Sequence, residues 1–389
     1  MAVTIHTSPQ SYTPSDNPIK WEFSSDQTAN VNFVYFVEVY VNGVLKGEHL
    51  IFTENGIYAK YDATDYASRF CDTPALTSTF DVSAGNNCEI YIKVYERYGT
   101  PPSLQASATS GTITAFKSSL SDADFIDWDY TDYAYATAKK WMSLFPRTER
   151  YFCGLTETMY LMYLTNNSVG QFLEVELFDE NDSLIIADSA GVSQNKITIL
   201  KVDPIALMAA TAGPITQAQF DQASYYEVWL DNGGGATEKF RIYIDRSCDM
   251  YNTKRFLFLS SIGSIESFSF TKATEETRDV KRYSFERNFG SWNTSNNFVY
   301  NLTDGREQDY LVTSSGKMSV SSDWIPEGLQ QWLVRELYES PYVFVIISSV
   351  NRRCKVLNST YKYKQGITDM IFNETIEIGL SDARKSVVV

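Results

Sequence analysis

Four aspartates within a short stretch come closest, by type and spacing, to a chemical site. They alternate with aromatic residues in "DADFIDWDY" and are Asp122, Asp124, Asp127 and Asp129. A calcium loop of the EF-hand kind needs acidic residues at its first, third and fifth positions, a glycine at the sixth and a glutamate at the twelfth. Asp122 and Asp124 match the first two positions, but Asp127 comes one residue late and no glycine follows. The pattern therefore favours a solvated acidic loop, with a weak divalent-cation site at these aspartates as the alternative.

The sequence offers few residues suited to other catalytic chemistry. The only two histidines, His6 and His49, lie in different segments, and a Ser-His-Asp or Cys-His arrangement would have to use one of them. The phosphate-binding, dinucleotide-binding, HExxH and GxSxG motifs do not occur. Among 48 acidic residues a carboxylate pair can always be found, so such a pair says little about glycoside hydrolysis. We expect no catalytic residues, no cofactor and no enzyme activity.

The cysteines predict thiols rather than cross-links. They are scattered, odd in number and never in Cys-x-x-Cys spacing: Cys71, Cys88, Cys153, Cys248 and Cys354. This distribution argues against a disulfide framework and against a zinc site. We expect small buried thiols in a protein made in a reducing cytoplasm.

The charge balance bears on partners. Lys and Arg number 33 against 48 Asp and Glu, which gives a net charge of −15. Affinity for nucleic acid comes mainly from Lys and Arg, so the chain is not expected to grip DNA. An acidic surface still suits a channel that DNA passes without specific binding, because like charges repel. The first residues, "MAVTIHTSPQSYTPSDNP", lack the pattern of a secretory signal, and no apolar run is long enough for a bilayer, so no membrane association is expected.

Residues 1–117 predict an immunoglobulin- or fibronectin-like β-sandwich. In "FVYFVEVYVNGVLKGEHLIF", apolar residues from Phe33 to Val41 alternate on one face, and Asn42-Gly43 is typical of a type I′ hairpin turn. A second alternating strand, "CEIYIKVYERY", would bury Ile90, Ile92 and Val94. Several short strands at such spacing are typical of a sandwich.

The rest of the chain predicts more β structure with one substantial helix. Residues 118–145 are expected to be an acidic-aromatic linker or docking segment, 146–320 a β-rich middle domain of sandwich or barrel-like form, and 321–389 a helix plus strands packed on it. Within "DWIPEGLQQWLVRELYESP", Asp323 is the expected N-cap and Pro326 lies in the first turn. Residues 215–223 predict a further short helix.

The stretch "RFLFLSSIGSIESFSF" predicts an aromatic strand, a tight turn and a second aromatic strand. Because Tyr, Trp and Phe are enriched in interface cores, we expect part of this hairpin to contact a neighbouring subunit, with its own core as the alternative. The interface candidates here and in the C-terminal helical segment are Phe256, Phe258, Phe268, Phe270, Trp324 and Trp332.

Four segments together carry a resemblance to a known family. The segments "NPIKWEFSSD", "YFVEVYVNG", "MYNTKRFLFLSSIGSIESFSF" and "SDWIPEGLQQWLVRELYESPYVF" resemble tail and neck structural proteins of Bacteroidetes-infecting tailed phages, including crAss-like phages. In that family an Asn-x-Leu-Gly-Gly turn joins the aromatic strands, whereas here the turn is Ser260 to Ser264 with a single glycine. The resemblance implies a virion component assembled in the host cytoplasm, and no active site.

These observations lead to three expectations about function. The first is a non-enzymatic virion protein in a tail, neck or baseplate ring of on the order of six or twelve copies, contacting neighbouring tail or portal proteins. The second is a receptor- or glycan-binding tail appendage. The third is a tail-associated polysaccharide hydrolase that uses a carboxylate pair.

Overall fold

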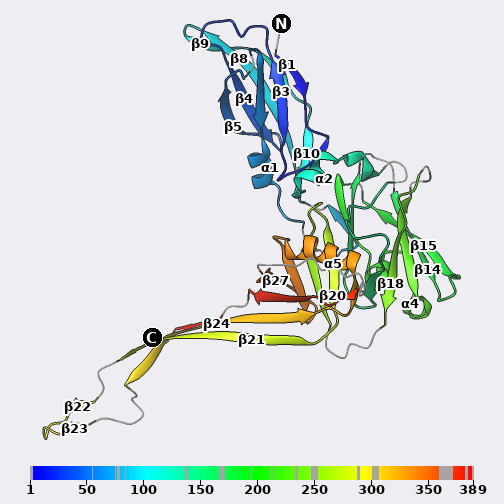
Figure 1. Ribbon diagram of the computed structural model, residues 1–389, viewed down its shortest axis with the longest axis vertical. Helices are drawn as coiled ribbons and strands as arrows, with labels where there is room; N and C mark the ends of the chain where they lie inside the picture. The colour runs from blue at the N-terminus through cyan, green and yellow to red at the C-terminus, as the bar shows by residue number, and fades with distance from the viewer. Residues whose placement is uncertain are drawn as a thin grey trace. The chain divides into compact units, whose positions relative to one another are not determined.

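The chain divides into two compact units, which are described separately. The computed structural model describes residues 3–54, 56–74, 76, 79–83, 85–135, 139–165, 171–193, 195–211, 213, 215–231, 233, 235–246, 253–286, 290–299, 306–358, 371–381 and 384–387. The first unit comprises Met1–Ser247 and Phe258–Phe268, and the second comprises Cys248–Leu257 and Ser269–Val389. Both consist mainly of β-strands with few helices, which confirms the expected fold class (Figure 1).

The first unit begins with the expected two-sheet sandwich, drawn in blue to cyan in Figure 1. One sheet has the order β1 (Thr4–Thr7), β3 (Lys20–Ser24) and β6 (Tyr58–Asp62). The other has the order β2 (Tyr12–Pro14), β10 (Ile113–Phe116), β8 (Asn87–Gly99), β4 (Val34–Val41) and β5 (Val44–Ile51), with β9 (Pro102–Thr109) also paired to β8. A short helix, α1 (Thr64–Phe70), follows β6.

Alternation along β4 and β8 builds the sandwich core, as predicted. Every second residue is buried along β4 and from Cys88 to Glu96 of β8, and residues from Val3 to Ala115 form one hydrophobic cluster. Asn42 and Gly43 have φ angles of 50° and 74°, which is the left-handed geometry that the predicted hairpin turn needs. The local sequence pattern was therefore sufficient to locate this hairpin and its buried face.

Two more sheets complete the first unit. A four-stranded sheet has the order β11 (Ala134–Tyr135), β13 (Tyr160–Thr165), β16 (Ile197–Lys201) and β7 (Asp81–Ser83). A five-stranded sheet has the order β12 (Tyr151–Gly154), β18 (Phe240–Asp245), β17 (Tyr225–Asp231), β14 (Gln171–Phe178) and β15 (Leu184–Val192). Two short helices are α3 (Pro204–Ala210) and the predicted α4 (Gln217–Gln222). Strand β7 lies in the sequence of the sandwich but pairs with β16, so the chain leaves the sandwich and returns to it.

The acidic-aromatic segment is anchored by two tryptophans. It contains α2 (Asp122–Ile126) and a 3-10 turn, η1 (Tyr130–Asp132). Trp128 is buried and donates from Nε1 to the Tyr12 carbonyl at 3.2 Å. Trp141 is also buried and donates from Nε1 to the Glu238 carbonyl at 3.0 Å. The aromatic residues of this segment thus dock on the same unit, while most of its aspartates remain at the surface.

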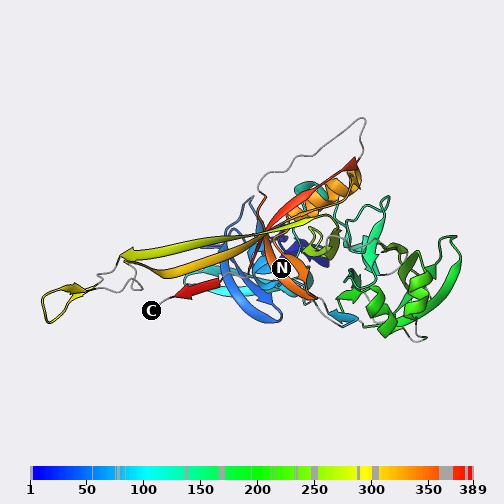
Figure 2. The ribbon, with the colours of Figure 1, turned by 90° about the horizontal axis from the view of Figure 1, so that it is seen from below.

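Most strands of an eight-stranded sheet belong to the second unit. The order is β20 (Ile265–Phe270), β19 (Lys254–Leu259), β26 (Val343–Ile347), β27 (Val350–Val356), β29 (Thr375–Leu380), β24 (Glu307–Ser321) and β21 (Thr274–Glu286), with β30 (Arg384–Val387) also on β24. Small two-stranded pairs are β22 (Ser291–Trp292) with β23 (Phe298–Val299) and β25 (Ile325–Pro326) with β28 (Ile371–Phe372). Figures 1 and 2 both show β21 and β24 running side by side as a long ribbon that leaves the rest of this sheet.

Two predictions made from the sequence differ from the structure of this unit. The predicted boundary at 320/321 falls inside β24, so it does not coincide with the division into compact units. The helix α5 (Glu327–Leu333) begins later than expected, because Ile325 and Pro326 pair with β28, and Pro326 is the N-cap. The Asp323 carboxylate instead accepts the N–H of Trp324. The apolar face formed by Leu329, Trp332, Leu333 and Leu337 is buried, and the helix continues as a π-helical turn, η3 (Val334–Tyr338).

Candidate assembly surface

The aromatic hairpin exists as predicted, but its side chains are largely internal. Phe256, Phe258 and Phe270 are each at most 1% exposed, and Phe268 is half-buried. The rings of Phe256 and Phe270 meet edge to face with centroids 5.1 Å apart. These residues therefore serve the chain's own core, which was the alternative to a subunit interface.

The turn of this hairpin is enclosed by other parts of the first unit. The Ser261 carbonyl accepts hydrogen bonds from the Ser119 N–H at 3.0 Å and the Ser118 hydroxyl at 2.6 Å. A Cβ atom on Gly263, whose φ is +87°, would lie 2.4 Å from the Lys117 carbonyl oxygen. Glu266 is buried, and its Oε1 accepts the Leu144 N–H at 2.8 Å. The single glycine of the turn is thus required both by its φ angle and by the close approach of backbone.

The two tryptophan candidates differ in solvent exposure. Trp332 lies on the buried face of α5 and is 4% exposed, so it packs within the second unit. Trp324 precedes the helix and is 65% exposed. Of the six side chains expected at an interface, Trp324 is thus the one that the structure leaves largely open.

The most exposed regular element is the outer part of β21 and β24. We call this "the ribbon" and define it as 278–286 paired with 307–316, together with the adjoining Arg306. Nearly every residue of β21 is exposed, and no described strand pairs with its outer edge. On the other side, β30 pairs with Leu311 to Ser314 of β24. The rest of the ribbon has only two strands among the described residues, and an isolated pair of strands is marginally stable in water, so this element is suited to gain a partner.

An aromatic cluster lies on the ribbon. Tyr283, Phe285 and Tyr310 are 44–46% exposed, and both Tyr283 and Phe285 place their rings about 6 Å from that of Tyr310. Nearby in sequence, Trp292 of β22 is 71% exposed and contacts Phe298 of β23 edge to face at 5.6 Å. These aromatic side chains are not covered by described residues to the degree that the hairpin aromatics are.

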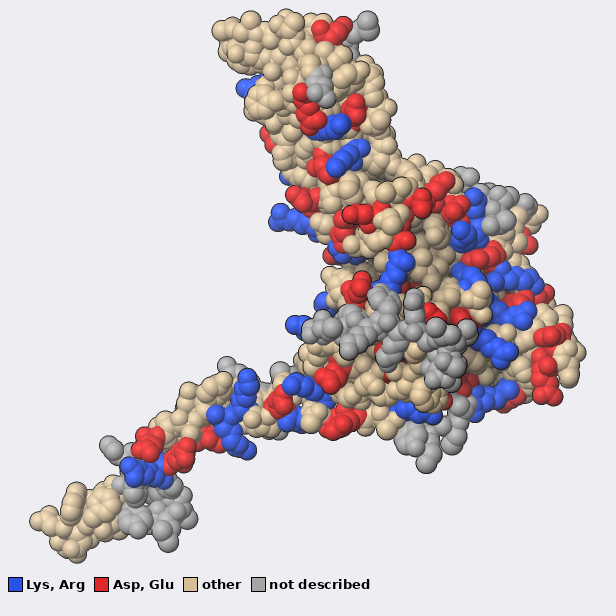
Figure 3. All heavy atoms as spheres, in the orientation of Figure 1, with Lys and Arg blue, Asp and Glu red and all other residues tan. Residues whose placement is uncertain are grey.

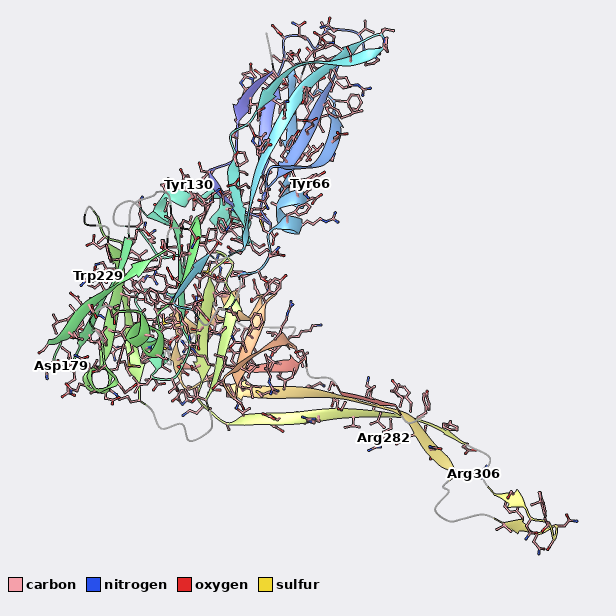
Figure 4. All side chains as sticks on the ribbon, turned by 180° about the vertical axis from the view of Figure 1, so that it is seen from behind. Tyr66, Tyr130, Asp179, Trp229, Arg282 and Arg306 are labelled. Carbon is pink, nitrogen blue, oxygen red and sulfur yellow. The ribbon has the colours of Figure 1, made fainter. Side chains whose placement is uncertain are left out.

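The ribbon is electrically balanced, unlike the chain as a whole. Figure 3 shows blue and red side chains interspersed along it, and Figure 4 labels Arg282 and Arg306 there. It carries four basic residues and four acidic residues, whereas the whole chain has a net charge of −15. Ion pairs join Arg282 to Asp309 at 2.9 Å and Lys317, next to the ribbon, to Asp279 at 2.5 Å. The latter, through the Lys317 hydrogen bond and charge, lowers the pKa of Asp279.

Two ribbon cations have no such pairing. Arg278 and Lys281 form no ion pair with any described residue, although Lys281 acts on Asp279 through its charge. Both belong to the exposed strand β21. They are therefore available to carboxylates outside the described chain.

The four candidate metal-binding aspartates act in local structure instead. Asp129 caps η1 by accepting the Thr131 N–H at 2.9 Å, and this backbone hydrogen bond lowers the pKa of Asp129. Asp122 and Asp124 lie in the first turn of α2, where negative charge is favourable, and Asp124 accepts the Ser121 hydroxyl. Asp127 is the C-cap of α2. Among the described residues, no group of three His, Cys, Asp or Glu side chains could hold a metal ion.

The two histidines make ordinary polar contacts. His6 Nε2 lies 2.7 Å from the Ser24 hydroxyl, and His49 Nε2 lies 2.7 Å from the Tyr66 hydroxyl. They occupy different strands, β1 and β5, of the two sandwich sheets. Neither contact involves a carboxylate that would orient the ring as a general base.

One feature of the sequence indicates the ribbon, namely the composition of the two faces of 278–286. Along "RDVKRYSFE" neither period-two face is apolar, because Arg278, Val280 and Arg282 share one face and Lys281 and Tyr283 share the other. A strand whose two faces both mix charge and aromatic residues has no face that a core would accept. This mixture indicates a strand exposed on both sides.

Comparison with known proteins identifies no family for this chain. No protein-family model matches it, and no curated protein matches it. Among solved structures, it is similar to titin A168–A169, at 10% identity and a TM-score of 0.24, over 63% of this chain and 98% of that one. It is also similar to the plexin A4 extracellular region, at 8% identity and a TM-score of 0.19, over 97% of this chain and 39% of the plexin chain. Likenesses this distant say nothing about function.

The length and hydropathy of the helices bear on whether they could cross a membrane. Within the described part of the chain, no helix combines the length and apolar character that crossing a membrane requires.

Proposed function

We propose that this protein is a non-enzymatic structural subunit that self-assembles through its ribbon. The proposal rests on the ribbon, because no described strand pairs with the outer edge of β21 and described residues leave its aromatic cluster about half exposed. Open strand edges and exposed aromatic residues are typical of surfaces that pair with another chain. Because nearly every residue of β21 is exposed, these side chains contribute little to the core of their own unit.

A second copy of this chain is the partner that we propose for the ribbon. Two proteins of charge −15 repel one another, so contact is least costly where the surface charge is balanced. The ribbon is such a place, with four charges of each sign. Its unpaired cations, Arg278 and Lys281, could in addition meet carboxylates of the acidic neighbour.

The proposed setting is a ring in the tail or neck of a phage virion, with neighbouring tail or portal proteins on either side. This setting is supported by the sequence resemblance to tail and neck proteins of Bacteroidetes-infecting phages. The acidic charge is suited to a channel through which DNA slides without binding. A closed ring needs head-to-tail contacts, in which an arm of one copy meets a different surface of the next.

The glycan-binding alternative would use exposed rings that a sugar can stack against. On the outer face of the sandwich, Tyr40 and Tyr91 stack on one another with centroids 4.7 Å apart and planes 5° from parallel. The hydroxyls of Tyr40 and Tyr95 both donate to Glu38. These rings and hydroxyls are already engaged with each other, so this face favours a structural function over a glycan site.

Light scattering of the purified full chain over a range of concentrations tests the proposal. We expect a stable complex of about six or twelve copies. A variant with Tyr283→Ser and Phe285→Ser should lose this assembly while remaining folded, as cooperative thermal unfolding of the dissociated chain would show. The matched control is Phe152→Ser with Phe172→Ser, two residues of the first unit with similar exposure of 49% and 50%.

Other outcomes of the same experiment decide against the proposal. A trimer would favour a fibre or receptor-binding appendage, and a monomer at every concentration would contradict self-assembly. Equal loss of assembly in the control variant would show that the ribbon is not the responsible surface. Trp324→Ser separately tests the tryptophan that the sequence indicated, and we expect it to assemble normally.

A further inference from the structure

Two cysteines of the sandwich core lie against each other. Cys71 is the C-cap of α1, and its N–H donates to the Ala67 carbonyl at 2.9 Å. Cys88 is the second residue of β8. Their Sγ atoms are 2.9 Å apart, and both side chains are buried in the same hydrophobic cluster. A disulfide bond is about 2.05 Å long, so a shift of less than about 1 Å would bring the sulfurs to bonding distance.

The surroundings hold this pair in place. The Cys71 thiol also lies 3.3 Å from the Ala115 carbonyl, and Ala115 is the cross-strand partner of Cys88 between β10 and β8. The hydrogen bond to Cys88 and burial raise the pKa of Cys71, while the same hydrogen bond lowers the pKa of Cys88. The Cys88 thiol thus loses its proton more readily than the Cys71 thiol, and thiol–disulfide exchange starts from a thiolate.

We propose that Cys71 and Cys88 are an oxidative cross-linking site that forms a disulfide with a low-molecular-weight disulfide as the oxidant. The Cys88 thiolate attacks one sulfur of the small disulfide, which forms a mixed disulfide and releases one small thiolate. Cys71 then loses its proton and attacks the Cys88 sulfur, which forms the Cys71–Cys88 bond and releases the second small thiolate. Two protein thiols are oxidised and one small disulfide is reduced to two thiols. Because both sulfurs are buried, the exchange takes place during folding or local opening.

The bond would close the excursion that the chain makes out of the sandwich. Strand β7 lies between the two cysteines in sequence and pairs with β16 of the neighbouring sheet. The Phe80 carbonyl accepts the Lys201 N–H at 2.7 Å next to this pairing. A disulfide at the base would hold both ends of the excursion, and closing a loop of this size stabilises mainly by restricting the unfolded chain. This inference does not depend on the proposed assembly.

A second buried cysteine environment supplies the control. Cys354 is buried in the second unit, and its thiol donates to the Val343 carbonyl at 3.5 Å. Burial alone raises its pKa to about 12. Cys354→Ser should therefore leave any cross-link unchanged, whereas Cys71→Ser and Cys88→Ser should each remove it.

The test is intact mass and peptide mapping of the full chain after refolding with oxidised glutathione. We expect a loss of about 2 Da, protection of two thiols from alkylation, and one linked peptide pair that joins residues 71 and 88. The oxidised chain should melt about 5–10 °C above the reduced chain, and the Cys354→Ser variant should show the same shift.

Wild-type mapping keeps the test decisive even where a cysteine variant fails to fold. Alkylation of all five cysteines after oxidation would overturn the proposal. A linked pair that joins either cysteine to a different one would also overturn it. Recovery of the 71–88 peptide pair from wild-type protein, with its loss on reduction, would support it without any variant.

Discussion

The β19–β20 hairpin and the ribbon both carry aromatic side chains but have opposite surroundings. Both are antiparallel pairs in the same sheet order, and both are rich in aromatic and branched side chains. Strand β19 is buried along its whole length, whereas β21 is exposed at all but its first residue. The difference shows that aromatic content predicts a strand but does not tell whether its side chains serve the chain's own core or an outside partner.

The hairpin and the ribbon also differ in how their polar groups are satisfied. In the hairpin, Ser261 and Glu266 bond to backbone groups of distant segments. On the ribbon, Asp309 and Asp279 pair with cations across the same two strands. A polar group buried without a partner is costly, so the hairpin is specified by its neighbours, while the ribbon is specified by its own two strands.

The largest expected effect comes from deleting one phenylalanine ring in each element. Phe258→Ala should lower the free energy of unfolding by about 3–5 kcal/mol, because the ring is fully buried and leaves a cavity. Phe285→Ala removes a ring that is 46% exposed. It should change the free energy of unfolding of the dissociated chain by about 0.5 kcal/mol or less. Urea denaturation at low protein concentration measures both. Similar losses at the two positions would contradict the comparison.

The turns provide the next largest difference. Gly263→Ala should cost about 2–4 kcal/mol, because the new Cβ would meet the Lys117 carbonyl and the φ angle is positive. Gly43→Ala, at a similar φ of +74° with nothing within 4 Å, should cost about 1 kcal/mol. Thermal denaturation of the two variants compares them directly. Equal costs would mean that φ alone, and not the enclosed position, determines the requirement for glycine.

Two glutamates extend the comparison to polar groups. Glu266→Ala leaves the Leu144 N–H without its acceptor and should cost about 1–3 kcal/mol. Glu266→Gln keeps an oxygen there and should recover part of this loss. Glu307→Ala, which removes only a bond from the Ser284 hydroxyl on the exposed ribbon, should cost about 0.5 kcal/mol or less. A larger loss for Glu307 than for Glu266 would reverse the assignment of the two elements.

The smallest expected effect is electrostatic. Lys317 lowers the pKa of Asp279, so this pair contributes stability above the ordinary pKa of about 3.9 and loses it as pH falls through the lower folded value. Lys317→Met should raise the pKa of Asp279 toward its ordinary range, as followed by NMR titration of the carboxyl carbon. Arg278→Met is the control and should leave that pKa unchanged. Because both partners are about half exposed, the effect on melting should be slight.

Local patterns predicted those parts of the molecule in which one strand face is buried. The alternation from Phe33 to Val41 and the Asn42-Gly43 turn predicted the β4–β5 hairpin, and the 215–223 segment predicted α4. The start of α5 was predicted too early, because the pairing of Ile325 and Pro326 with β28 comes from residues far away in sequence. Pairing between distant strands leaves no mark in the local pattern.

Local sequence patterns predicted the candidate assembly surface less well than the fold. The sequence indicated Phe256, Phe258 and Trp332 as interface residues, and the structure buries them in the chain. It did not indicate Tyr283, Phe285 or Tyr310, which are the aromatic residues left open on the ribbon. An aromatic side chain is equally suited to a core and to an interface, so its type cannot decide between them.

The sequence by itself determined the β class, the short-range hairpins and the acidic charge of the chain. These follow from residue type and from periods of two to four residues, which act over short distances along the chain. Only the tertiary structure decided that β7 leaves the sandwich, that Cys71 meets Cys88, and that no described strand pairs with the outer edge of β21. Each of these depends on which distant segments pack together, because burial is a property of the whole fold and not of any one strand.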